Sequence, residues 1–165
     1  MSSTKAASIT LSSLKYIKPV DLANSLQDAE TSSKVAIIDV RDNDHVGGNI
    51  RGSQWVPINQ LDARMPELLR TNQDRDRVVF HCMLSQQRGP KAALAYARAR
   101  AYQAEKEAKG QGKSSSTEEE KTNVEGNGKV YGQEVCVLEG GFGAWQSSYA
   151  EDETLTADYV EDLWE

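Results

Sequence analysis

Two short apolar runs limit what this chain can fold into more than any other feature of its sequence. Residues 35–40 read VAIIDV and residues 77–82 read RVVFHC, and β-branched and aromatic side chains dominate both runs. Continuous apolar runs of this length are typical of strands that are buried on both faces of a parallel sheet. The sequence therefore predicts an α/β fold with a mostly parallel central sheet.

Segments with helical spacing alternate with these runs, as expected when helices connect parallel strands. Pro19 suits the first turn of one such helix, because proline lacks only an N–H that would be unpaired there anyway. The further predicted elements are an extended piece and a helix over residues 15–27, a strand over 53–58, a helix over 59–70 with Asn59 as N-cap, a helix over 91–108, and a strand and a short helix over 130–149.

A polar stretch interrupts the pattern before its last strand. Residues 109–129 have too few apolar side chains to offset the entropy lost on ordering, and we predict a disordered inserted loop there. The 165 residues fit one domain, residues 1–165, because the segment after this loop is too short to form its own core. Residues 151–165 are an acidic tail, for which we predict a terminal helix that docks through Tyr159, Val160 and Leu163.

The composition argues against several classes of protein. The net charge is -6 and the basic residues are scattered, so we expect no nucleic-acid partner. No apolar run approaches the roughly 20 residues of a membrane span. Two cysteines and two histidines are too few for a disulfide framework or a structural metal site. We therefore expect a soluble monomer, cytoplasmic or nuclear, that holds no metal and binds no membrane.

The stretch HCMLSQQRGP, residues 81–90, carries the chemistry. It places Cys82 at a strand end, then five loop residues, Arg88, and the start of a helix. Loop N–H groups and a helix N-terminus can converge on the oxygens of an anion, and the arginine fork suits phosphate or arsenate. The predicted oxyanion-binding loop consists of Met83, Leu84, Ser85, Gln86, Gln87 and Arg88.

The same donors would stabilise the thiolate form of Cys82, which could then attack a bound oxyanion without a separate base. The alternative is a buried strand-end cysteine beside a solvated arginine, and for an isolated cysteine this is the more common situation. The whole constellation favours catalysis, and we predict Cys82 and Arg88 as the catalytic residues.

These segments resemble a known family. HCMLSQQRGP resembles the active-site loop of the M-phase inducer phosphatases and of the eukaryotic arsenate reductases, both of which have the rhodanese fold. IIDVRDNDHVGGNIRGSQWVP and VCVLEGGFGAW are similar to the segments that flank that loop. The resemblance spans residues 37–145 and implies a rhodanese-like fold, with a mostly parallel five-stranded sheet between helices on both faces. Sulfurtransferases of this fold typically have a loop one residue shorter.

The chain departs from the family pattern at two positions. The inducer phosphatases typically have an acid after the cysteine, where Met83 stands here, so the usual proton donor is missing. They often have a second cysteine at the position of Val40, so the resemblance supplies no resolving thiol. We interpret Cys136 as a core residue and expect an outside thiol such as glutathione if one is needed. Three carboxylates lie in loops that could approach this site, and we interpret each of them as solvated: Asp42, Asp44 and Glu139.

Several residues are expected to support the loop. His81 should point away from the nucleophile, because adjacent strand residues face opposite ways. The resemblance implies that Asp39 and Arg41 pair to shape the pocket wall. Gly140 and Gly141 should let a neighbouring loop pass close to the active loop, residues 82–88. The side chains of Ser85 and Gln86 could face either the ligand or water.

The function that these features favour is a protein phosphatase, specific for phosphotyrosine or of dual specificity, that works through a phosphocysteine intermediate and needs no cofactor. Arsenate reduction on the same loop is an alternative, with glutathione as co-substrate and glutaredoxin as partner. A rhodanese sulfurtransferase and a non-catalytic module that binds phosphorylated partners remain open as well.

Overall fold

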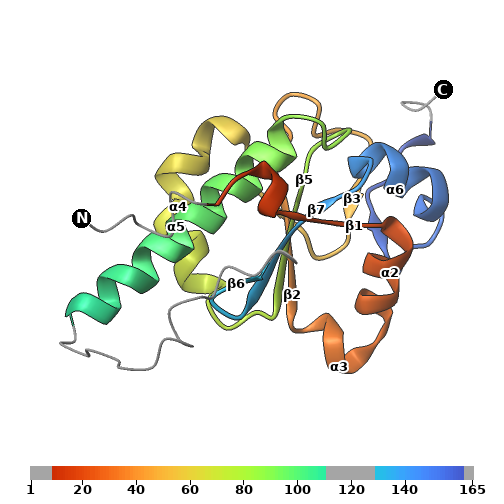
Figure 1. Ribbon diagram of the computed structural model, residues 1–165. Helices are drawn as coiled ribbons and strands as arrows, with labels where there is room; N and C mark the ends of the chain where they lie inside the picture. Colours follow the sequence, from red (N-terminus) through yellow and green to blue (C-terminus); the bar gives the residue numbers. More distant parts are fainter. Residues whose placement is uncertain (1–8, 111–128, 162–165) are drawn as a thin grey trace.

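The computed structural model of the protein describes residues 9–110 and 129–161 (Figure 1). At its centre lies a sheet whose five main strands all run parallel, in the order β1-β7-β5-β2-β4. The predicted α/β fold with a mostly parallel sheet is confirmed. A short sixth strand pairs antiparallel with β7 and was not predicted. The strands are β1 (Lys15–Ile17), β2 (Val35–Asp39), β4 (Gln54–Trp55), β5 (Arg77–His81), β6 (Lys129–Val130) and β7 (Gln133–Leu138).

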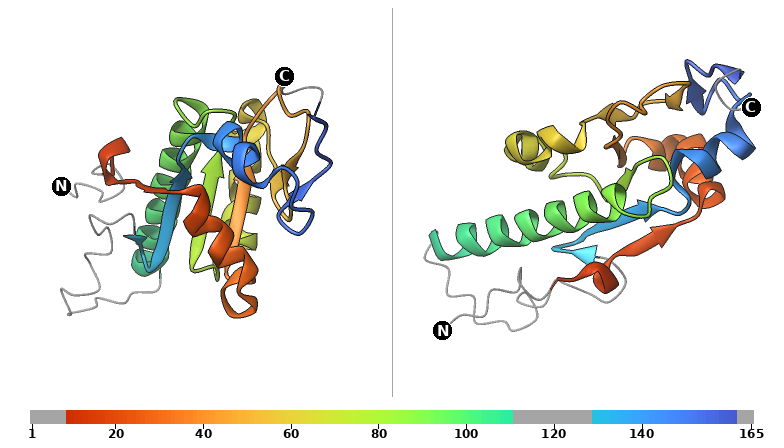
Figure 2. Two further views of the ribbon diagram at one scale, coloured as in Figure 1. Left: turned by 90° about the vertical axis from the view of Figure 1, so that its right-hand side faces the viewer. Right: turned by 90° about the horizontal axis from the view of Figure 1, so that it is seen from above.

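Helices cover both faces of this sheet, as Figures 1 and 2 show. The helices α4 and α5 pack on one face, and α2 and α6 pack on the other. Residues of β5 alternate between the two cores: Val78 and Phe80 lie under α4 and α5, and Val79 lies under α2 and α6. This alternation explains why the strand is apolar throughout. The helices are α2 (Pro19–Gln27), α3 (Ala29–Ser32), α4 (Leu61–Thr71), α5 (Arg88–Gly110) and α6 (Gly141–Tyr149), with 3₁₀ turns η1 (Leu11–Ser13) and η2 (Ile58–Gln60).

The carboxyl ends of β2, β5 and β7 lie side by side, because these strands are parallel neighbours. Three loops leave from this edge of the sheet: residues 40–48, residues 82–87 and residues 139–140. Ligands of open α/β sheets bind at this edge. The fold therefore brings the active loop, the acidic loop after β2 and the glycine loop before α6 together.

The prediction of a terminal helix in the acidic tail is wrong for residues 151–160. Thr156–Ala157 instead forms a strand, β8, that pairs antiparallel with β3 (Asn49–Ile50). Leu155 and Thr156 are buried, whereas Val160 is exposed. The burial of Leu155 and the pairing of Thr156–Ala157 with β3 therefore take the place of the expected helix. Leu163 lies outside the described residues.

The strand predicted over residues 53–58 is shorter than expected, because only Gln54–Trp55 pairs with β2. Pro57 follows, which has no N–H to donate to a sheet. The prediction of Asn59 as N-cap is also wrong, since Asn59 lies inside the turn η2 and α4 begins at Leu61.

The helix predicted over residues 91–108 is present and longer, because α5 already begins at Arg88 and runs to Gly110. Gly89 and Pro90 fit in its first turn, where a missing N–H costs nothing. Most of the loop predicted over residues 109–129 lies outside the described residues. Its two ends belong to α5 and to β6.

Candidate active site

Cys82 follows directly after β5 and is almost completely buried. Two backbone N–H groups donate to its Sγ, from Ser85 at 3.2 Å and from Gly89 at 3.4 Å. One donor belongs to the loop and the other to the first turn of α5. Both groups favour a negative charge on the sulfur, and the helix N-terminus adds to this effect.

The loop turns sharply at Ser85, whose φ of 54° lies in the left-handed region. This turn directs the Ser85 N–H back to the sulfur. The Ser85 side chain is buried, and its Oγ has no hydrogen-bond partner within the described ranges. Of the other loop side chains, Met83 is half-buried and the following three are exposed to solvent: Leu84, Gln86 and Gln87.

The N-terminus of α6 holds the backbone of the active loop in place by hydrogen bonds. The N–H groups of Phe142 and Gly143 donate to the carbonyl oxygens of Cys82 and Met83, at 3.0 Å and 2.8 Å. A Cβ at Gly141 would lie only 2.5 Å from the Met83 oxygen, so a side chain there would collide with the loop. Because two loop carbonyls are bound to α6, they face α6 and not the predicted anion site.

Arg88 forms an ion pair that the sequence did not indicate. Its Nη1 and Nη2 donate to Oδ1 and Oδ2 of Asp44, at 2.8 Å and 2.6 Å. The interpretation of Asp44 as a solvated carboxylate is therefore wrong. The hydrogen bonds from Arg88 lower the pKa of Asp44 to about 2, so Asp44 is ionised at neutral pH. Asp42 lies 3.8 Å from Arg88 Nη1, and Glu139 is exposed.

Behind the loop, Asp39 and Arg41 form a fully buried ion pair, with Arg41 Nη2 at 2.7 Å from Asp39 Oδ2. Arg41 also donates to the Gly48 carbonyl at 2.8 Å and stacks on the Phe142 ring at 4.4 Å. Burial alone would raise the pKa of Asp39, but the hydrogen bonds and the positive charge of Arg41 lower it. The pair thus joins the acidic loop to α6.

His81 supports the active loop through a contact with its backbone. Its Nδ1 lies 3.0 Å from the Cys82 carbonyl oxygen, which can only accept, so Nδ1 carries the proton. Its Nε2 lies 3.8 Å from Asp39 Oδ2 and has no hydrogen bond to any described residue. Burial lowers the pKa of His81 and favours the neutral ring. No contact of His81 with the Cys82 sulfur is present in the described structure.

Cys136 lies in the middle of β7 and is completely buried. Burial raises the pKa of its thiol to about 12. Since the chain has only these two cysteines, no second reactive thiol accompanies Cys82.

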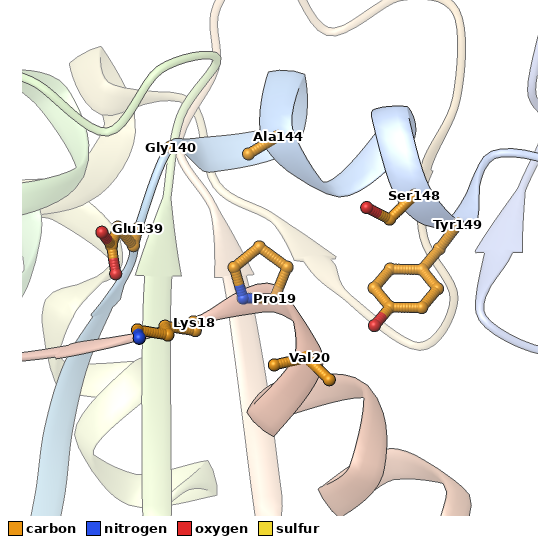
Figure 3. Close-up of a pocket in the computed structure, with 8 residues that line it drawn as sticks. All are labelled: Lys18, Pro19, Val20, Glu139, Gly140, Ala144, Ser148 and Tyr149. Atoms are coloured by element: carbon orange, nitrogen blue, oxygen red, sulfur yellow. The ribbon is translucent and has the colours of Figure 1, made fainter.

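A surface hollow of about 500 Å³ lies between the N-terminal end of α2 and α6 (Figure 3). Gly140, which precedes the glycine that touches the loop, forms part of its wall. No local sequence pattern indicates this hollow, because its walls come from two helices that are far apart in the chain. Its lining residues are Lys18, Pro19, Val20, Glu139, Gly140, Ala144, Ser148 and Tyr149.

Within residues 9–110 and 129–161, no three His, Cys, Asp or Glu side chains are grouped so that they could hold a metal ion. A membrane span would need a longer apolar helix than any in these ranges.

Comparison with known proteins adds the following. The family model of the rhodanese-like domain matches residues 20–148. The chain is similar to the CDC25-like phosphatase YCH1 of Saccharomyces cerevisiae, with 32% identity over 95% of this chain and 98% of the yeast protein. It is also similar to arsenate reductase 2.1 of Oryza sativa subsp. japonica, with 40% identity over 50% of this chain and 52% of that protein. The solved structure of a yeast protein tyrosine phosphatase of the rhodanese family is 31% identical, with a TM-score of 0.66 over 95% of this chain and 99% of that one.

Proposed function

The chain belongs to the rhodanese-like domain family, and from this premise we propose that it is a cysteine-dependent phosphatase that hydrolyses phosphomonoesters such as phosphotyrosine. The observation that carries the proposal is the seven-residue loop from Cys82 to Arg88, with two N–H groups on the Cys82 sulfur. The name of the yeast relative, a CDC25-like phosphatase, agrees with it.

The proposed reaction has two steps. The Cys82 sulfur attacks phosphorus, an S–P bond forms, and the ester P–O bond breaks. Its electron pair leaves with the alkoxide or phenolate, which takes a proton from water. Water then attacks the phosphocysteine and restores the thiolate, with release of inorganic phosphate and a proton. Loop N–H groups and Arg88 stabilise the charge on the phosphoryl oxygens in both steps.

The leaving group decides which phosphomonoesters react well. Met83 cannot donate a proton, and Asp44, with a pKa of about 2, holds none at neutral pH. A phenolate leaves without protonation more readily than an alkoxide. The proposed substrates are therefore aryl phosphates, with phosphotyrosine preferred to phosphoserine by roughly the factor of 10² to 10⁴ that a general acid contributes.

Arsenate reduction is the second candidate, favoured by the same absence of a proton donor and by the name of the rice relative. Cys82 would form an S–As bond with arsenate and release water. Glutathione would then attack, so that two thiols supply the two electrons that reduce As(V) to As(III). Because Cys136 is buried, the second thiol has to come from outside, and a glutaredoxin-type partner would reduce the resulting mixed disulfide.

The two reactions are separated by assaying the purified protein with an aryl phosphate and, separately, with arsenate, glutathione and glutaredoxin. Cys82→Ser serves as the blank and Cys136→Ala as the control for the other thiol. We expect aryl phosphate turnover that Cys82→Ser abolishes and Cys136→Ala retains. Turnover in the arsenate assay and none with the aryl phosphate would support the second candidate. Turnover by Cys82→Ser in either assay would refute the role of Cys82 in that reaction.

Two other functions are tested in the same preparation. A thiosulfate and cyanide assay detects a sulfurtransferase, and clear turnover there would contradict the argument from loop length. A Cys82→Ser protein that still binds phosphorylated peptides as tightly as the wild type, when neither protein has activity, would indicate a binding module.

A further inference from the structure

Asp44 holds only one of the two edges of the Arg88 guanidinium. Its two carboxylate oxygens accept from the terminal nitrogens Nη1 and Nη2. A guanidinium has five N–H donors, so this arrangement leaves three, and two of them, Nε–H and the second N–H of Nη2, together form another fork. Arg88 Nε makes no hydrogen bond to any residue in the described parts of the chain. A complete edge of Arg88 is thus available to an oxyanion while Asp44 stays in place.

Asp44 is itself held firmly by its neighbours. The Asp42 N–H donates to Asp44 Oδ1 at 3.0 Å. On one side, Arg41 is anchored in the buried pair with Asp39. On the other side, the His45 ring stacks on Trp55 with 4.3 Å between ring centres. These contacts restrain the acidic loop after β2, which places Asp44 beside Arg88.

From this geometry we propose that Asp44 is a positioning residue, which fixes Arg88 by its outer edge so that its inner edge meets the oxyanion on Cys82. The proposal rests on the proposed oxyanion chemistry of the site. Arginine has a long side chain with many rotamers. A guanidinium that Asp44 already holds in place loses less conformational freedom when the ligand binds. The acidic loop after β2 would then belong to the active site.

A second effect of Asp44 acts in the opposite direction, because its negative charge repels a bound dianion. Both carboxylates near Arg88 are about a third exposed, with 35% for Asp44 and 34% for Asp42, so this repulsion is screened by water and salt. Salt does not restore the orientation that the Arg88 guanidinium loses when Asp44 is removed. We therefore expect the positioning effect to dominate, most clearly at high salt.

The test measures binding without turnover. Inorganic phosphate and, separately, arsenate are titrated as protectants of Cys82 against alkylation, which is followed by mass spectrometry, in wild type, Asp44→Ala and Asp44→Glu. Asp42→Asn is the matched control, since it removes a charge from the same loop without removing a hydrogen bond to Arg88. All variants are compared at low salt and at about 1 M salt, where the Debye length is about 3 Å.

We expect Asp44→Ala to weaken protection by both anions about tenfold at high salt, with a similar fall in kcat/KM for an aryl phosphate. Asp44→Glu, which keeps a carboxylate, should recover most of the affinity, and Asp42→Asn should change it less than twofold. Equal or tighter binding by a folded Asp44→Ala at high salt would overturn the proposal, because Asp44 would then be a competitor of the ligand. If the wild type itself shows neither protection nor turnover, the proposed function fails instead.

Discussion

Gly141 is the residue at which one added methyl group would do most harm to the loop. Its φ is +61°, and a Cβ there would lie 2.5 Å and 2.6 Å from the carbonyl oxygens of Met83 and Cys82. Both carbonyls accept hydrogen bonds from α6, so neither can move without loosening the loop. We expect Gly141→Ala to lower kcat/KM for an aryl phosphate at least tenfold and the unfolding free energy by about 2 kcal/mol.

Steady-state kinetics and urea denaturation measure the two effects. Gly132→Ala is the matched control, since Gly132 has a φ of +81° and nothing within 4 Å of its added Cβ. It should share the backbone strain of Gly141→Ala and keep wild-type activity. If Gly141→Ala were as active as Gly132→Ala, the contact between α6 and the loop would not control the site.

We expect His81 to make the stability of the fold depend on pH. Burial lowers its pKa, more than the Asp39 charge and the Cys82 carbonyl raise it. In the unfolded chain a histidine titrates at about pH 6.5, so below that pH the unfolded state takes up a proton that the folded state resists. The stability that the neutral ring contributes is therefore present above about pH 6.5 and lost as the pH falls below it.

His81→Asn tests this dependence, because an amide N–H can replace Nδ1–H as a donor to the Cys82 carbonyl. Urea denaturation between pH 5 and pH 8 should give a steeper loss of stability on acidification for the wild type than for the variant. Four carboxylates have a lowered pKa, and they contribute only at a more acidic pH, around and below about 4: Asp39, Asp44, Glu134 and Asp152. Identical slopes for both proteins above pH 5 would contradict the assignment of the effect to His81.

At the scale of elements, the sequence predicts best what is encoded locally. The runs over residues 35–40 and 77–82 are apolar throughout because β2 and β5 are covered on both faces, and their prediction as buried strands is correct. The strand β8 has only two residues, and its partner β3 lies more than a hundred positions away in the chain. No local pattern encodes such a pairing.

The site follows the same rule. The order of Cys82, five loop residues, Arg88 and a helix is visible in the sequence because these residues are contiguous. The pairing of Arg88 with Asp44 depends on how two loops from neighbouring strands lie at one edge of the sheet. Charge alone could not distinguish Asp44 from Asp42 or Glu139.

The tail after α6 is part of the fold, and its removal should have a measurable effect. Leu155 is 2% exposed, and the Thr156 hydroxyl accepts from Trp145 Nε1 at 3.0 Å and donates to the Tyr149 carbonyl at 2.7 Å. We expect Leu155→Ala to lower the unfolding free energy by about 2 to 4 kcal/mol in urea denaturation. Val160→Ala, at an exposed position, should stay within about 0.5 kcal/mol of wild type. Equal stability of the two variants would mean that the tail does not support the fold.

At the scale of the whole molecule, the parallel sheet assembles the site. Because β2, β5 and β7 end at one edge, the acidic loop, the active loop and the N-terminus of α6 meet there. These three segments are far apart in the sequence and are spread over residues 39–143. Each loop fixes another: Asp44 contacts Arg88, and Phe142 contacts the Cys82 carbonyl. The proposed chemistry therefore takes place at the sulfur of Cys82.

The most direct test of this account is to trap the intermediate. The protein is mixed with an aryl phosphate, quenched with acid within one turnover, digested, and analysed by mass spectrometry. We predict a phosphoryl group on the peptide that contains Cys82, absent from Cys82→Ser, and a burst of aryl alcohol equal to the active-site concentration. Turnover of the aryl phosphate without a Cys82 adduct, and with full activity in Cys82→Ser, would contradict the account.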